Sequence, residues 1–150
     1  MICKNKYSYP INVTNKARVS YKESPAHKGR LQHAVDFICP EGTPIKAALD
    51  GLVVEVKQDS NLGGQTEDFD MMGNYIEIKH PNGEYSIYEH IMQNGSTVKV
   101  GDNVKVGQNI GCSGKTGWIA HLGPHLHFDV HVYVRRGSED YESIKINWVK

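Results

Sequence analysis

The sequence predicts an all-β fold of antiparallel sheets, arranged as in barrel-sandwich domains. Helical periodicity is nearly absent, and 15 glycines and 6 prolines interrupt the chain at short intervals. Between these breaks lie short runs rich in Val, Ile and Tyr, which is the pattern of many short strands joined by turns. We expect strands at residues 35–38, 44–48, 52–56, 75–79, 85–88, 97–100, 109–112 and 126–134.

The connections between these runs also carry signals. Asn82-Gly83 lies between the expected strands 75–79 and 85–88 and predicts a tight hairpin. Residues 59–72 are polar, acidic and glycine-bearing, so they are expected to form a long surface loop. Residues 1–24 show no clear period. We expect them to form an irregular N-terminal arm, followed by one folded domain at 25–150.

Composition excludes several classes of protein. Lys plus Arg and Asp plus Glu both number 17, so a nucleic-acid-binding surface is not favoured. No apolar run approaches the roughly 18 residues of a membrane span, and the N-terminus lacks the apolar stretch of a signal peptide. Cys3, Cys39 and Cys112 are isolated, so free thiols are expected and cysteine ligation of zinc is not.

The strand expected near the C-terminus carries the clearest chemical signal. Between positions 125 and 132, the apolar residues occupy the even positions, and the odd positions hold His125, His127, Asp129 and His131. Side chains alternate between the two faces of a strand, so one face is expected to be buried and the other to be chemical. Imidazole binds zinc and transfers protons near neutral pH. This strand therefore predicts part of a metal-catalytic centre, or alternatively a polar face that happens to carry histidines.

Zinc needs further ligands from elsewhere in the chain. Asp36 interrupts an apolar strand, which indicates either a solvent-facing carboxylate or one held by a cation. His33 precedes it by three residues and would face the opposite side of a continuous strand. His27 could loop back to the same side, whereas a bulge would be needed to bring in His33. His90, near the end of the strand at 85–88, is a third histidine candidate.

Taken together, these segments resemble the lysostaphin-like zinc metallopeptidases, which cleave peptide cross-links of bacterial cell walls. The resemblance covers about residues 25–132 and includes, at Gly123–His127, an intact glycine-proline-histidine-x-histidine block, which is the most specific element of that family. The matching blocks follow the order of the family and lie at residues 27–29, 34–37, 40–45, 50–53, 73–76, 80–83, 88–91, 98–102, 107–111, 114–117 and 123–128.

The resemblance implies the lysostaphin-type peptidase fold with a central groove, and one Zn²⁺ per chain. By carry-over, His27, Asp36 and His127 would bind the metal, and His90 and His125 would be the catalytic histidines. His125 would move protons between water and the leaving amine, and His90 would donate a hydrogen bond to the developing oxyanion. The spacing from His27 to Asp36 is long, as in one subgroup of the family, and His33 stays open as the alternative ligand. Asp129 stands where Glu is more usual, and it would either orient a ligand histidine or lie on the surface.

The resulting prediction is a zinc endopeptidase that acts on peptidoglycan cross-links or stem peptides, as a monomer without nucleic acid or a membrane span. The alternatives are an inactive metallopeptidase-like scaffold and a carrier or binding module, because carrier domains use similar hairpin units. Residues 1–24 could also occlude the site. The family suggests the cell envelope or secretion, although no signal peptide precedes the arm in this sequence.

Overall fold

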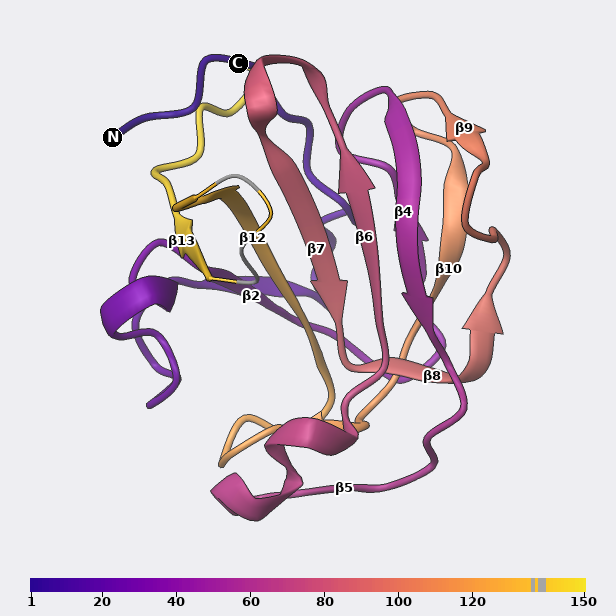
Figure 1. Cartoon of the computed structure of the whole chain (residues 1–150). Coiled ribbons are helices and arrows are strands. Elements are labelled where there is room, and N and C mark those ends of the chain that lie inside the picture. Colours follow the sequence, from indigo (N-terminus) through magenta and orange to yellow (C-terminus); the bar gives the residue numbers. More distant parts are fainter. Residues whose placement is uncertain (136, 138–139) are drawn as a thin grey trace.

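The computed structural model describes residues 1–135, 137 and 140–150. These residues form thirteen strands and three short 3-10 helices, so the all-β prediction is confirmed (Figure 1). The strands are β1 (Arg18–Ser20), β2 (Val35–Ile38), β3 (Pro44–Lys46), β4 (Gly51–Lys57), β5 (Gly63–Gly64), β6 (Tyr75–Lys79), β7 (Tyr85–Glu89), β8 (Ile91–Ser96), β9 (Asn103–Val104), β10 (Asn109–Ser113), β11 (Gly117–Trp118), β12 (His125–Tyr133) and β13 (Tyr141–Ser143). The helices are η1 (Gly29–Leu31), η2 (Glu67–Met72) and η3 (Pro81–Gly83).

One large sheet dominates the part of the chain that the structure describes. Its strands follow the order β1-β2-β12-β7-β6-β4-β9, and β13 pairs with β12 beside this path. A smaller sheet, β3-β10-β8, packs behind it, and β5 and β11 form a separate parallel pair (Figure 1). The long strand β12 runs through the centre of the large sheet and pairs antiparallel with both β2 and β7.

Most expected strands form within a few residues of their predicted bounds. The hairpin at Asn82-Gly83 is present between β6 and β7, and Asn82 has the positive φ of 66° that such a turn requires. The prediction of a strand at 97–100 is wrong, because the strand in this region is β8, at Ile91–Ser96. The segment 59–72 is mostly exposed, as expected, but it contains β5 and η2.

The core lies between the large and the small sheet. On β12, Leu126, Phe128 and Val130 are fully buried in the core. Ile45 of β3 and Ile110 of β10 belong to the same cluster of buried side chains. Burying aliphatic and aromatic side chains of this size contributes about 1.5–3 kcal/mol each, so this layer holds β12 firmly in place. The opposite face of β12 therefore carries the polar side chains of the strand.

Residues near both chain ends pack together along this core. Ile2 forms a bridge with Lys145 and Tyr7 with Trp148. The Tyr7 hydroxyl donates a 2.8 Å hydrogen bond to the buried carboxylate of Glu84. Thus the first residues are fastened to the domain, although a boundary between residues 24 and 25 stays a prediction.

Two further sequence expectations concern cysteines and membrane spans. Cys3, Cys39 and Cys112 are free thiols, and Cys112 is only half-buried. Among the described residues, no helix has the length and apolar character needed to cross a membrane.

Candidate metal centre

A row of polar side chains crosses three neighbouring strands on the face of the large sheet that points away from the core. His127 on β12 pairs with Asp36 on β2 at one side and with Glu89 on β7 at the other. Residues directly opposite each other in antiparallel strands point to the same face, so these three side chains lie in one row. Their sequence neighbours Phe37 and Phe128 point the other way, into the core.

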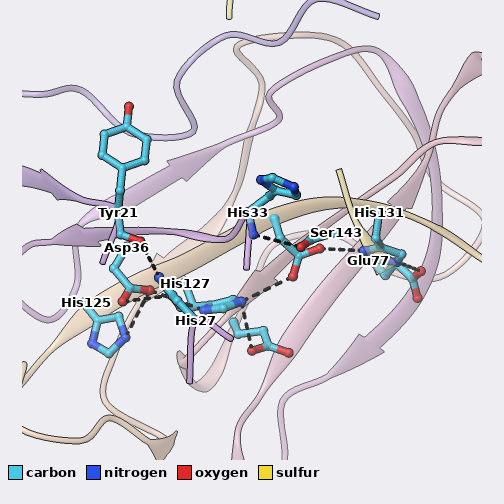
Figure 2. Close-up of polar contacts among 11 residues, drawn as sticks. Tyr21, His27, His33, Asp36, Glu77, His125, His127, His131 and Ser143 are labelled. Carbon is cyan, nitrogen blue, oxygen red and sulfur yellow. Dashed lines mark hydrogen bonds and ion pairs between the residues drawn. The ribbon is translucent and has the colours of Figure 1, made fainter. Parts of the chain in front are cut away.

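The loop between β1 and β2 brings His27 to this row. Its Nδ1 lies 3.0 Å from the carbonyl oxygen of Tyr21, which leaves Nε2 facing Asp36 Oδ2 at 3.2 Å. On the other side of the carboxylate, His127 Nδ1 lies 3.3 Å from Asp36 Oδ1 (Figure 2). One ligand atom from each of His27, Asp36 and His127 lies within 4.8 Å of the others, and all three side chains are buried.

His33, the alternative left open by the sequence, lies elsewhere. Its backbone N–H donates a 3.0 Å hydrogen bond to Ser143 Oγ, and its ring is turned away from Asp36 (Figure 2). The groups of potential metal ligands among the described residues include His27 but not His33.

The donor atoms of this cluster fit a zinc ion. Both oxygens of Asp36 and Nε2 of His27 are buried without a hydrogen-bond partner. Unpaired buried charges are costly, and a bound cation would remove that cost. Burial alone would raise the pKa of the Asp36 carboxyl, but its contacts with His127 and His27 lower this pKa below the usual range, so the carboxylate is ionised. Two imidazoles and one carboxylate are a common catalytic zinc set, which keeps one position for water.

His90 and His125 lie beside the cluster, with ring centroids 4.5 Å apart. His90 follows β7 with a φ of +68°, a left-handed conformation that is costly outside glycine and is often found at functional sites. Burial lowers the pKa of both histidines, and for His90 the neighbouring His125 and His127 lower it further, well below its ordinary value. Both rings are therefore neutral at pH 7.

The tautomers of these two rings follow from their backbone contacts. His90 Nδ1 lies 2.7 Å from the carbonyl oxygen of Thr116, and His125 Nδ1 lies 2.8 Å from that of Gly123. A carbonyl oxygen only accepts hydrogen bonds, so each Nδ1 carries the proton. Each neutral ring thus has an unprotonated Nε2, and that of His125 is 3.6 Å from Asp36 Oδ1.

The other polar positions on β12 also belong to this face. Asp129 and His131 are fully buried rather than surface residues. They contact each other, and His131 also contacts Glu77 of β6. Our sequence reasoning missed Glu77 and Glu89. Glu77 carried the same signal as Asp36, namely an acidic residue between two apolar ones within a strand, Ile76 and Ile78.

Comparison with known proteins gives a consistent family match. Residues 30–140 match the model of a family described as Peptidase family M23. The chain is 38% identical over 104 residues to the peptidoglycan DD-endopeptidase ShyC of Vibrio cholerae, covering 69% of this chain and 20% of that protein. It is 42% identical over 101 residues to lysostaphin of Staphylococcus staphylolyticus, covering 67% of this chain and 18% of that protein.

Solved structures show the same fold. The catalytic domain of lysostaphin from Staphylococcus simulans superposes with a TM-score of 0.58 at 35% identity, covering 79% of this chain and 82% of that one. A zinc-containing peptidase from Vibrio cholerae gives a TM-score of 0.58 at 30% identity, covering 84% of this chain and 36% of that one. The chain spans between 22% and 29% of the length of two further curated relatives, each described as an uncharacterized metalloprotease, from Haemophilus influenzae and Buchnera aphidicola.

Proposed function

The chain belongs to peptidase family M23, and on that premise we propose that it is a zinc-dependent endopeptidase that hydrolyses peptide bonds in peptidoglycan cross-links or stem peptides. Relatives named as peptidoglycan endopeptidases, among them ShyC and ShyA of Vibrio cholerae, support this substrate class. A monomeric state and an N-terminal arm at residues 1–24 stay predictions.

One observation carries the proposal. The unpaired donor atoms of His27 and Asp36 converge with His127 Nδ1 in a buried cluster, next to two neutral histidines. An inactive scaffold or a carrier module would gain nothing from leaving a carboxylate buried without hydrogen bonds. An endopeptidase needs such a centre, because a bound Zn²⁺ polarises the scissile carbonyl group and acidifies water.

His125 is suited to act as the general base. The hydrogen bond from its Nδ1 to Gly123 leaves Nε2 unprotonated and close to the Asp36 carboxylate. We therefore assign to His125 Nε2 the uptake of a proton from the attacking water and its delivery to the leaving amine. A base that is already neutral at pH 7 is ready for this step.

His90 requires a refinement of the role that the family resemblance implies. In its neutral form the only ring proton is on Nδ1 and is donated to Thr116, so Nε2 accepts rather than donates. His90 could donate to an oxyanion only after Nε2 has taken up a proton. The rings of His90 and His125 meet edge to face, with centroids 4.5 Å apart.

Metal analysis and digestion of cell walls together test the proposal. We expect the purified protein to contain one zinc ion per chain and to release peptide fragments from purified peptidoglycan, with loss of both after chelation. His127→Ala and His27→Ala should lose zinc while keeping the far-UV circular dichroism of the wild type. Stoichiometric zinc in His127→Ala would reject the ligand set, and a zinc-loaded wild type that leaves peptidoglycan intact would reject the substrate.

His33→Ala is the matched control for these variants. It removes a histidine of the same segment whose ring lies outside the cluster. We expect it to keep both zinc and activity, and loss of zinc in this variant would restore His33 as the ligand in place of His27.

A further inference from the structure

A second group of buried polar residues extends from the metal cluster along the same face of the sheet. His127, Asp129 and His131 occupy alternate positions of β12 and therefore point to one side. Glu77, on β6, approaches His131 across the intervening strand β7 (Figure 2). All four residues are at most 5% exposed.

The contacts between these residues form an unbroken chain. His127 Nε2 lies 3.3 Å from Asp129 Oδ2, and Asp129 Oδ1 lies 2.7 Å from His131 Nδ1. His131 Nε2 then lies 3.0 Å from Glu77 Oε1, which also accepts a hydrogen bond from the Tyr133 hydroxyl. Each of these contacts lies within hydrogen-bond distance. Glu77 is therefore linked to the ligand His127 through the side chains of His131 and Asp129.

The direction of each hydrogen bond follows from the chemistry of the partners. Ionised carboxylates only accept, so both ring nitrogens of His131 must donate, one to Asp129 and one to Glu77. His131 is then an imidazolium ion held between two carboxylates. For the same reason His127 Nε2 carries a proton that it donates to Asp129, and Nδ1 is left as the nitrogen that faces Asp36.

The surroundings of His131 suit a positive charge. Its ring stacks against Tyr85 with an interplanar angle of 9°. The centroid of the ring lies 4.2 Å from that of Tyr141 and 5.5 Å from that of Tyr133. Faces of aromatic rings attract cations. Burial alone would lower the pKa of His131, but Asp129 and Glu77 raise it to about 9. His131 thus places one positive charge between the carboxylates of Asp129 and Glu77.

We propose that Asp129, His131 and Glu77 form a positioning relay for the metal centre, which fixes the ring orientation and tautomer of His127 so that Nδ1 is presented to the zinc ion. Asp129 makes the direct contact, and His131 and Glu77 hold Asp129 in its rotamer and supply the balancing charge. The relay rests on the proposed zinc-dependent function. It acts before any substrate arrives, so it is measurable as metal affinity.

The first test measures zinc affinity by competition with a chromophoric chelator. We expect Asp129→Asn to bind zinc about 10–100-fold more weakly than the wild type, which is the usual cost of removing an outer partner of a ligand histidine. Glu77→Gln, which touches no ligand, should weaken binding by a smaller factor in the same direction. Glu84→Gln is the matched control, since Glu84 is an equally buried carboxylate that binds Tyr7 instead.

Each outcome distinguishes the relay from a merely structural role. Urea unfolding of the metal-free proteins measures any general loss of stability, and we expect such a loss in all three variants. Zinc affinity, in contrast, should stay at the wild-type value only in Glu84→Gln. Affinities of Asp129→Asn or Glu77→Gln within about twofold of the wild type would overturn the relay. A wild type that binds no zinc would instead overturn the proposed function.

A spectroscopic readout keeps the test independent of catalysis. In ¹⁵N-labelled zinc-loaded protein, the Nε2 proton of His127 should resonate at low field and exchange slowly, because a buried carboxylate accepts it. In Asp129→Asn this proton should shift upfield and exchange faster, while Glu84→Gln leaves it unchanged. An unaltered His127 signal in Asp129→Asn would contradict the proposal even if zinc affinity fell.

Discussion

Gly117 and Gly107 have nearly the same positive φ in different surroundings, and this pair permits a quantitative test of packing beside the site. Gly117 has a φ of +84° and Gly107 a φ of +85°. A Cβ atom on Gly107 would meet nothing within 4 Å. On Gly117 it would lie 2.7 Å from the Cα of Gly73 and 3.3 Å from Nδ1 of His90.

The expected costs of alanine follow from these distances. In Gly107→Ala only the left-handed backbone is penalised, at about 1–2 kcal/mol. In Gly117→Ala the same penalty applies, and the clash with the backbone of Gly73 adds about 1–3 kcal/mol of overpacking. The free energy of unfolding should therefore fall by roughly 2–5 kcal/mol in Gly117→Ala, which corresponds to a Tm lower by about 4–20 °C for a chain of this size.

Urea unfolding of both variants, followed by peptidase assays on the folded fraction, checks this reasoning. Because the added methyl group pushes against His90, we expect Gly117→Ala to lower kcat while zinc content stays at the wild-type level. Gly107→Ala should keep full activity. Equal stability losses in the two variants would show that the close approach between Gly117 and Gly73 has no energetic weight.

Four further outcomes are expected. Because the pKa of His131 is raised to about 9 in the folded state, its stabilising contribution is complete below about pH 6.5 and is lost as the pH rises toward 9. Over this pH range, the urea midpoint of the wild type should therefore fall more than that of His131→Gln. Midpoints that fall in parallel in the two proteins would contradict this expectation. Since burial lowers the pKa of His125 and His90, kcat/KM should decline on the acid side only below about pH 6.5, and an acid limb centred above pH 7 would refute this. Tyr7→Phe removes the hydrogen bond to the Glu84 carboxylate and should cost about 1.5–3 kcal/mol in urea unfolding, with an unchanged midpoint as the contrary result. Zinc at 100 times its Kd should stabilise the metal-free protein by about 2.7 kcal/mol, or roughly 5–11 °C in Tm, and a Tm insensitive to zinc would exclude specific binding.

The sequence was most informative where side chains alternate strictly. The pattern along β12 correctly separates the buried Leu126 and Phe128 from the polar His125 and His127, because strand geometry imposes a period of two. The strand expected at 97–100 does not form, because in this region backbone pairing rather than side-chain alternation determines where the strand lies. The strand that forms, β8, contains Gln93, Asn94 and Gly95, which have low strand propensity, and it is held by backbone pairing with β10.

The parts of the site that depend on long-range contacts were beyond sequence reasoning. Strand parity favours His27 over His33, but the path of the loop that contains η1, which no periodicity describes, decides which ring reaches Asp36. Likewise, Glu77 is 54 residues from His131 in the chain, and only the order of strands in the sheet brings the two together. Local patterns predict which residues share a face of a strand, whereas partners across strands require the topology.

The pairing of β12 with two neighbours at once links catalysis to folding. A shift of this strand by one residue would turn His125, His127, Asp129 and His131 toward the apolar layer and expose the aliphatic set in their place. Molecules with this shifted strand register would thus be unable to bind the metal. A zinc ion present during folding would selectively trap molecules in the correct alignment, so this protein should refold in higher yield with the metal than without it.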